Sequence, residues 1–353
     1  MHQPTSDLRI RATRPLPAPA VLEEEIPLDD AGSARVARAR QEIAAIMAGN
    51  DDRLLVVAGP CSIHDPVAAV EYAALLRSAA ERHAGELVVA MRVYFEKPRT
   101  VVGWKGLIND PDLDGTFDIG KGLRIARKLM ADITVAGLPI ATEFLDTTLG
   151  QYYADLVSWG AIGARTVESQ VHRELASGLS MPVGFKNRTD GDVQVAVDAI
   201  RSARHPHWFP SLARDGSPAC MQTTGNEDTH LVLRGGTLGS NYSSADVASA
   251  AEMLSKNGLP ARIMVDCSHA NSGRDAELQP AIALDLAARI AAGDRVISAV
   301  MIESNLLGGS QDYRAVPLVR GRSVTDACLS WEKTLPLIAR MAEAVGARRR
   351  AAS

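Results

Sequence analysis

Eight short apolar runs alternate with eight longer stretches along most of this chain. The apolar runs, interpreted as strands, are Leu54–Ala58, Leu87–Met91, Ile140–Thr142, Ala161–Ala164, Val183–Phe185, Leu231–Leu233, Ile263–Val265 and Ile297–Ile302. The stretches between and after them, interpreted as helices, cover about 66–82, 119–136, 149–158, 168–178, 191–203, 243–257, 279–292 and 326–346. Strands this apolar on both faces are typical of a buried parallel sheet. The alternation predicts an α/β protein with a closed (β/α)₈ TIM barrel; an open doubly wound sheet is the alternative.

Two segments lie outside this alternation. Residues 1–48 are expected to form an N-terminal extension with an intersubunit or regulatory role. It would consist of a Pro-rich extended arm to about residue 30 and a helix capped by Asp29 or Asp30 that ends near Ala48. The alternating LRIRA segment of the arm suits pairing with the sheet edge of another subunit. Residues 49–353 are expected to form the barrel, with a β-hairpin at about 205–225 inserted before the sixth strand and a turn near Asp215-Gly216.

Composition excludes several classes of protein. The 353 residues carry a formal net charge of -4, which disfavours a nucleic-acid partner. No apolar run approaches the ~18 residues of a membrane span, so no membrane role is expected. Four cysteines without C-x-x-C spacing and an N-terminus unlike a signal peptide predict a cytoplasmic location.

One thiol, one imidazole and two carboxylates lie close to the first and the last of the predicted strands along the chain. Cys61, His269 and Glu303 come after the first, seventh and eighth runs, and Asp326 precedes the last predicted helix. This mixture of donors suits a divalent transition metal. The alternative is structural: Cys61 as a buried apolar side chain and Asp326 as a helix cap.

Every predicted strand leads to an ionisable side chain. In order these are Cys61, Arg92, Glu143, Arg165, Lys186, Arg234, His269 and Glu303. Lys97, Arg99 and Thr100 cluster around the rigid Pro98 just beyond the second strand, which suits a phosphate group. Since barrel enzymes place their active site at the carboxyl ends of the strands, these cations are expected to converge on a multiply charged anion.

Several motifs then carry a resemblance to a known family. GPCSIHDP, MRVYFEKPRTVVGWKGLINDP, WGAIGART, PVGFKN, LVLRGG, MVDCSHANS and SVTDACLSWE resemble the type I, feedback-regulated 3-deoxy-D-arabino-heptulosonate 7-phosphate (DAHP) synthases, from about residue 50 to 345. The resemblance implies condensation of phosphoenolpyruvate with D-erythrose 4-phosphate, the first step of the shikimate pathway. It also implies a divalent metal, an aromatic amino-acid effector, and a homodimer or homotetramer.

The resemblance also implies roles for individual residues. It places the metal on Cys61, His269, Glu303 and Asp326, and favours Mn²⁺, with Co²⁺, Fe²⁺ or Zn²⁺ as alternatives. Phosphoenolpyruvate would bind Arg92, Lys97, Arg165, Lys186 and Arg234, with backbone contact from Gly163 and Ala164. Erythrose 4-phosphate would bind Arg99 and Thr100, and Asp326 would also lie beside the substrates. Lys97, Glu143, Arg165 and Lys186 are the expected catalytic residues. One departure is Arg188, where the family usually has Gly.

Two other functions remain open from the sequence. The related 3-deoxy-D-manno-octulosonate 8-phosphate synthases use the same phosphoenolpyruvate chemistry on arabinose 5-phosphate, but the Lys-Pro-Arg-Thr loop and the inserted hairpin argue against them. A catalytically idle barrel acting as a scaffold or sensor is the other alternative. All four expected metal ligands are present, which argues against an idle barrel.

The resemblance implies an effector site away from the catalytic mouth. Its expected members come from the third βα loop, the fourth helix and the hairpin: Asp146, Gly150, Gln151, Leu175, Leu179, Ser180, Phe209, Ser211 and Met221. An apolar pocket with a few polar groups suits an aromatic amino acid. Position 150 is Gly here, where phenylalanine- and tyrosine-sensitive relatives tend to carry Pro. The extra room favours tryptophan as the effector.

Overall fold

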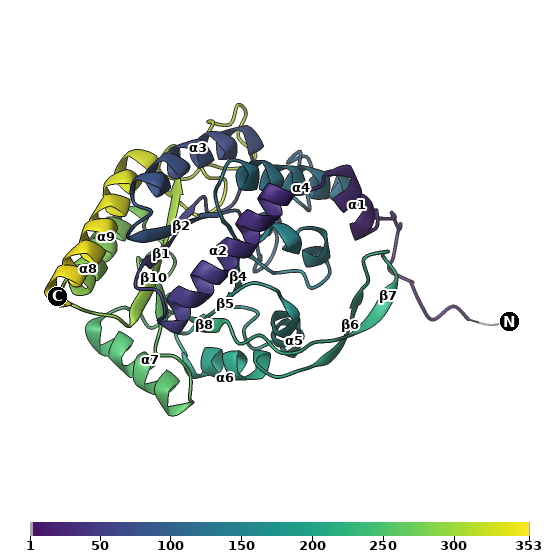
Figure 1. Cartoon of the computed structure of the whole chain (residues 1–353). Helices are drawn as coiled ribbons and strands as arrows, with labels where there is room; N and C mark the ends of the chain where they lie inside the picture. Colours follow the sequence, from purple (N-terminus) through teal and green to yellow (C-terminus); the bar gives the residue numbers. More distant parts are fainter. Residues whose placement is uncertain (1–2, 353) are drawn as a thin grey trace.

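The computed structural model describes residues 3–352 and confirms the closed (β/α)₈ barrel (Figure 1). Within this range, eight parallel strands pair in the order β1-β2-β3-β4-β5-β8-β9-β10, and β10 pairs with β1 to close the barrel. Closure pairs the backbone groups that an open sheet would leave at its edges. The strands are β1 (Leu54–Gly59), β2 (Leu87–Arg92), β3 (Ile140–Glu143), β4 (Trp159–Ile162), β5 (Val183–Lys186), β8 (Thr229–Leu233), β9 (Ile263–Asp266) and β10 (Ile297–Asn305).

Helices surround the strands on the outside (Figure 1). They are α3 (Pro66–Arg82), α4 (Ile119–Val135), α5 (Gln170–Gly178), α6 (Gln194–Ala203), α7 (Ser244–Lys256), α8 (Gln279–Ala291) and α9 (Trp331–Ala352). No helix within residues 3–352 is both long and apolar enough to cross a membrane.

The prediction of a helix at 149–158 was wrong. This crossover consists of two 3₁₀ turns, η1 (Leu149–Tyr152) and η2 (Ala154–Leu156). Tyr153 interrupts the helical geometry with a φ of -149°. Its ring stacks on Phe144, with ring centroids 5.9 Å apart. Packing of this aromatic pair therefore outweighs the local helical pattern.

Helix α2 (Asp30–Ala48) closes the base of the barrel, the end at which the strands begin. Asp29 caps it as predicted, because its side chain accepts a hydrogen bond from the Gly32 amide at 2.6 Å. Ile43, Ile46 and Met47 join the apolar cluster that fills the barrel interior. Figure 1 shows α2 running across the strands at this end.

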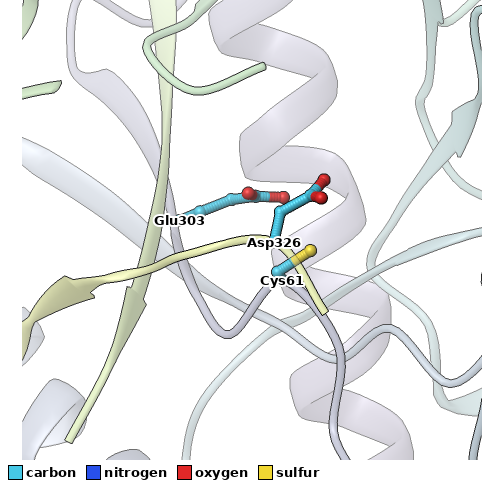
Figure 2. A group of neighbouring side chains, drawn as sticks. All are labelled: Cys61, Glu303 and Asp326. Carbon is cyan, nitrogen blue, oxygen red and sulfur yellow. The ribbon is translucent and has the colours of Figure 1, made fainter. Parts of the chain in front are cut away.

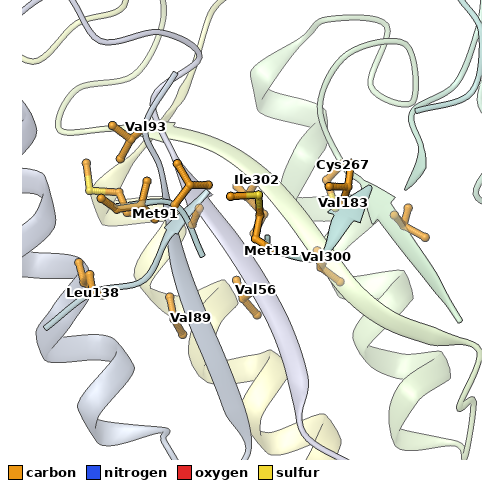
Figure 3. Packing of buried hydrophobic residues seen from close by; sticks show 14 of the residues in the cluster. Val56, Val89, Met91, Val93, Leu138, Met181, Val183, Cys267, Val300 and Ile302 are labelled. Atoms are coloured by element: carbon orange, nitrogen blue, oxygen red, sulfur yellow. The ribbon is translucent and has the colours of Figure 1, made fainter. Parts of the chain in front are cut away.

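The strands alternate between an inner and an outer apolar layer. Val57, Ala90 and Met301 pack inside the barrel with α2. Their neighbours in sequence belong to the layer between the strands and the surrounding helices, including Val56, Val89, Met91, Val300 and Ile302 (Figure 3). Because both faces are buried, the strands are mostly apolar before their carboxyl ends, with Thr229, His230 and Ser298 as buried exceptions.

The prediction that the N-terminal arm is extended to about residue 30 was wrong. Residues 19–25 form a short helix, α1 (Pro19–Glu25). Tertiary contacts hold it: the Ala20 amide donates to the Arg214 carbonyl at 2.8 Å, and Glu25 pairs with Arg124 at 2.7 Å. These contacts join segments far apart in sequence, so the absence of local periodicity did not reveal this helix.

The inserted hairpin is confirmed. Strands β6 (Trp208–Leu212) and β7 (Pro218–Gln222) pair antiparallel, and Gly216 adopts a φ of +82° in the connecting turn. Two predicted boundaries were wrong. Gly163 and Ala164 follow β4 as a loop, and the last helix begins at Trp331 rather than 326, because Leu329–Ser330 (β11) first pairs with the end of β10.

Candidate active site

A layer of charged side chains lies above the apolar barrel interior. Each follows an inward-facing residue by two positions, so strand alternation turns it toward the barrel axis. On β2, for example, Ala90 faces inward and is followed by Arg92, and on β10 Met301 is followed by Glu303. The same offset on the other strands gives Glu143, Lys186, Arg234 and Asp266. The sequence therefore builds an apolar floor with a charged layer at the carboxyl ends of the strands.

Three of the four predicted metal ligands come together. The ligand atoms of Cys61, Glu303 and Asp326 all lie within 4.8 Å of one another. Figure 2 shows them pointing toward one another from the loop after β1, from β10 and from the segment before β11. Cys61 and Glu303 are buried, and Asp326 is exposed toward the cavity. This spacing allows one divalent ion to contact all three groups.

His269 lies beside this group without being part of it. Its Nε2 is 3.6 Å from Glu303 Oε1, and its Nδ1 is 2.8 Å from Asp266 Oδ2. His269 adopts a φ of +54°, which is unusual for a residue other than glycine. Asp266 thus orients the imidazole in the way that carboxylates orient metal-binding histidines.

Arg92 is fully buried beneath the metal-ligand group. Its Nη2 donates to Glu303 Oε1 at 2.9 Å, its Nη1 contacts Met301 Sδ at 2.8 Å, and its guanidinium stacks 3.9 Å from the Tyr94 ring centroid. Burial raises the pKa of the Glu303 carboxyl, but His269, Arg92 and Lys97 outweigh that effect and lower it. Glu303 is therefore held as a carboxylate.

The Cys61 thiol needs a further positive charge beside it to ionise to the thiolate. Burial and the nearby Glu303 charge raise the pKa of its thiol, while Lys97, which forms a hydrogen bond with it, acts in the opposite direction. Since the thiolate is the metal-binding form, an ion bound beside Cys61 would supply the missing positive charge.

A cavity of about 430 Å³ opens above the charged layer. Its walls contain the Lys-Pro-Arg-Thr loop, Glu143, Gly163, Ala164, Asp326 and His269, together with six cations: Lys97, Arg99, Arg165, Lys186, Arg234 and Arg274. Burial lowers the pKa of Arg234, and repulsion from Arg274 and Arg165 lowers it further. The cavity is therefore built for an anion of more than one charge.

Most of the predicted substrate residues line this cavity, and one does not. Arg92 lies below it, engaged with Glu303. Glu143 packs directly against Gly163, where an added Cβ would stand 2.3 Å from Glu143 Oε1. Only glycine leaves room for this carboxylate. Arg188, the departure from the family pattern, pairs with Glu168 at 2.8 Å and with Asp190.

Two residues near the site were missed from the sequence. Asp266 is fully buried and pairs with both Lys186, at 3.3 Å, and His269. Its signal was present, since it ends an apolar strand two positions after the inward-facing Met264. Arg274 lines the cavity from the loop after His269, where sequence periodicity carries no information about side-chain direction.

The predicted effector residues gather around the third βα loop and the hairpin. Gln151 Nε2 lies 3.7 Å from Met221 Sδ on β7. The Asp146 side chain accepts hydrogen bonds from the Thr148 and Leu149 amides at the start of η1. Helix α5 carries Leu175 and lies against β6. Strand β6 carries Ser211 and the buried Phe209. Leu179 and the exposed Ser180 follow α5. An added Cβ at Gly150 would be 3.0 Å from Phe144.

Comparison with known proteins identifies the family of this chain. The family model described as the DAHP synthetase I family matches residues 27–338. The Phe-sensitive phospho-2-dehydro-3-deoxyheptonate aldolase of Escherichia coli K12 is 55% identical over 99% of this chain and 100% of its own length. The Trp-sensitive enzyme of Enterobacter agglomerans is 52% identical over 98% of this chain and 99% of its own. The Francisella tularensis enzyme structure superimposes with a TM-score of 0.95 at 51% identity, covering 96% of this chain and 99% of its own. The chain belongs to the DAHP synthetase I family.

Proposed function

We propose that this chain condenses phosphoenolpyruvate with D-erythrose 4-phosphate to form DAHP and phosphate, and that an aromatic amino acid inhibits it. The observation that carries this proposal is the cavity lined by six cations beside Cys61, Glu303 and Asp326. Two phosphates and a carboxylate balance that charge, and the metal-ligand group lies where an aldehyde oxygen would reach it. The high identity to enzymes named for this product supports the same conclusion.

A divalent ion would be held by Cys61, Glu303 and Asp326, with His269 as the fourth ligand. The donor set fits, because a thiolate, an imidazole and two carboxylates match Mn²⁺, Fe²⁺, Co²⁺ and Zn²⁺ without choosing among them; we propose Mn²⁺. When bound, the ion would polarise the aldehyde of erythrose 4-phosphate as a Lewis acid.

The cations of the cavity would hold the two substrates. Arg165, Lys186 and Arg234 would bind the phosphate and carboxylate of phosphoenolpyruvate, with backbone contact from Gly163 and Ala164. Arg92 would contribute its charge from beneath the cavity. Arg99 and Thr100 would bind the phosphate of erythrose 4-phosphate at the opposite wall. With the two substrates bound in this way, C3 of phosphoenolpyruvate would face the aldehyde carbon.

Bond formation and bond cleavage would then follow in sequence. C3 attacks the aldehyde carbon, and Lys97 donates a proton to the aldehyde oxygen. Water, deprotonated with the help of Glu143, adds to the cationic C2 and gives a hemiketal phosphate. The C–O bond to phosphate then breaks while the C2 hydroxyl passes its proton to the departing phosphate, which leaves the C2 ketone of DAHP. Arg165, Lys186 and Arg234 stabilise the charge on the departing phosphate.

We propose that the enzyme is a cytoplasmic homodimer or homotetramer. A reducing compartment would protect the Cys61 thiol that the mechanism requires. On the N-terminal arm, Leu8 is 71% exposed and Ile10 is 61% exposed within this chain, so a neighbouring subunit would bury them. The arm would then connect the effector region of one subunit with the other.

Metal dependence is the first prediction. Wild-type enzyme with Mn²⁺ should form DAHP from phosphoenolpyruvate and erythrose 4-phosphate, and a chelator should abolish turnover. Cys61→Ala should lose at least about 100-fold in activity together with bound metal. Cys220→Ala, at an exposed cysteine on β7, is the matched control and should stay active. Full turnover by metal-stripped enzyme, or a preference for arabinose 5-phosphate, would contradict the proposed reaction.

The effector is proposed to be tryptophan, bound between η1, α5 and the hairpin. Support comes from the Gln151–Met221 contact and from Ser211, whose buried hydroxyl has no hydrogen-bond partner among the described residues. A ligand group could satisfy that hydroxyl. Glycine at position 150 avoids a crowded contact, because an added Cβ would lie 3.0 Å from the Phe144 ring.

Effector choice is the second prediction. Titration of activity with tryptophan, phenylalanine and tyrosine should show tryptophan as the strongest inhibitor. Gly150→Pro should shift sensitivity away from tryptophan, because the proline ring would press against Phe144 and displace it. Ser211→Ala should raise the inhibitory concentration by about tenfold, the effect of one hydrogen bond to a charged ligand group. Inhibition by phenylalanine or tyrosine alone would show that the Gly150 argument is wrong.

Glu96 connects the substrate loop that contains Lys97 with the third βα loop, which carries predicted effector residues. It precedes Lys97 in the substrate loop, it is 5% exposed, and it accepts a hydrogen bond from the Tyr153 hydroxyl at 3.3 Å. Burial and the charge of Asp146, a predicted effector residue, raise the pKa of Glu96 to about 7. A neutral Glu96 therefore stabilises the contact between the substrate loop and the third βα loop.

A pH dependence of stability is the third prediction. Because the pKa of Glu96 is raised on folding, this residue contributes to the free energy of unfolding. That contribution is fully present below about pH 4.5 and is lost as the pH rises through about 7. Relative to Glu96→Gln, wild-type stability should fall by about 3 kcal/mol across this interval in urea unfolding. Glu24→Gln, at an exposed position, should follow the wild type. Parallel curves for wild type and Glu96→Gln would contradict the pKa shift.

A further inference from the structure

A second cavity lies at the base of the barrel, at the end opposite the candidate active site. It has a volume of about 260 Å³ and lies between α2, the end of α3 and the starts of β2, β3 and β4. We call it the basal cavity. Its apolar wall consists of Val36, Ala39, Ala80, Ala84, Leu87, Val88, Val89, Leu138 and Pro139.

Two buried hydroxyls in the wall of the basal cavity have no partner. Thr134, at the end of α4, is 2% exposed, and Ser158, just before β4, is fully buried. Neither side-chain oxygen has a hydrogen-bond partner among the residues that the structure describes. Because a buried hydroxyl without a partner destabilises the folded protein, a polar atom of a bound molecule would be stabilised beside either of them.

The outer part of the basal cavity carries unbalanced positive charge. Arg53 is paired with Asp51 and Glu42, and Glu81 is paired with Arg77. Arg38 has no ion pair within residues 3–352, and the nearest carboxylate oxygen to Arg35 is that of Asp29, at 4.0 Å. Arg35 is anchored by a hydrogen bond from its Nε to the Thr134 carbonyl at 3.1 Å. Two guanidiniums are therefore placed at the rim without a strong anionic partner.

From these observations we propose that the basal cavity binds a small organic anion with one carboxylate, a compact apolar body and a hydroxyl or keto oxygen at its other end. Arg35 and Arg38 hold the carboxylate at the rim. The apolar wall packs against the body, and Thr134 and Ser158 bind the distal oxygen. Water alone would satisfy the two hydroxyls, but it would leave the apolar wall wet and the guanidiniums without an anion.

This site is separate from both sites described above. Its lining residues belong to α2, α3, the α4–β3 turn and the amino ends of β2, β3 and β4. The substrate cavity is lined by loops at the opposite ends of the strands. The proposed effector residues lie just before and on η1, on and after the end of α5, and on the hairpin. Saturating phosphoenolpyruvate and phenylalanine, tyrosine or tryptophan therefore leave the basal cavity accessible.

The test is calorimetric titration of the full-length, Mn²⁺-loaded enzyme with 4-hydroxybenzoate, with phosphoenolpyruvate and the inhibitory amino acid present at saturation. Binding is expected with a Kd of about 1 mM or tighter. Arg38→Glu should weaken it at least about tenfold, since a charge-assisted contact becomes repulsive. Arg201→Glu, an exposed charge reversal on α6, is the matched control and should leave the Kd unchanged.

The distal oxygen is tested by a pair of ligands. Wild-type enzyme should bind 4-hydroxybenzoate more tightly than benzoate, and the double variant Thr134→Val with Ser158→Ala should bind the two equally. Absence of saturable binding up to about 20 mM would mean that the cavity holds water only. Binding that is unaffected by Arg38→Glu, or that is lost when the other two sites are saturated, would also overturn the proposal.

Discussion

The buried ion pair between Arg92 and Glu303 is the interaction on which the rest of the site depends. Both side chains lie inside the barrel, at 0% and 2% exposure, directly above an apolar interior. Removing one member of such a pair typically costs about 3–5 kcal/mol, because the other charge is left buried and uncompensated. The pair also fixes the Glu303 carboxylate toward Cys61 and Asp326. In the folded barrel, the Glu303 carboxylate is therefore already held in place for the metal-ligand group.

The charged layer is balanced in two steps. Within the protein, carboxylates neutralise part of the positive charge: Glu303 pairs with Arg92, and Asp266 pairs with Lys186 and His269. The other cations of the cavity have no carboxylate partner at hydrogen-bonding distance within residues 3–352: Lys97, Arg99, Arg165, Arg234 and Arg274. Phosphoenolpyruvate and erythrose 4-phosphate would supply the missing negative charge. The repulsion from Arg274 and Arg165, which adds to the effect of burial in lowering the pKa of Arg234, would then be offset by the bound substrates.

Sequence reasoning predicted the elements whose signal is periodic. The eight strands, the cap of α2 at Asp29 and the hairpin turn at Gly216 followed from local chemistry. Of the candidate site, the positions of side chains at strand ends were predicted, as with Arg92, Glu143 and Glu303; their roles stay predictions. Sequence reasoning failed where tertiary contacts determine the local structure. Helix α1 depends on its contacts with the hairpin and α4, the third crossover depends on the Phe144–Tyr153 stack, and the direction of Arg274 depends on a loop.

Anomalous diffraction at the manganese edge, on crystals of enzyme with Mn²⁺ and phosphoenolpyruvate, tests the central claim most directly. The account predicts one peak bounded by Cys61 Sγ, His269 Nε2 and carboxylate oxygens of Glu303 and Asp326, each at about 2.0–2.6 Å. It also predicts phosphoenolpyruvate density against Arg165, Lys186 and Arg234. A manganese peak away from Cys61 and Glu303, or phosphoenolpyruvate bound outside these cations, would contradict the account.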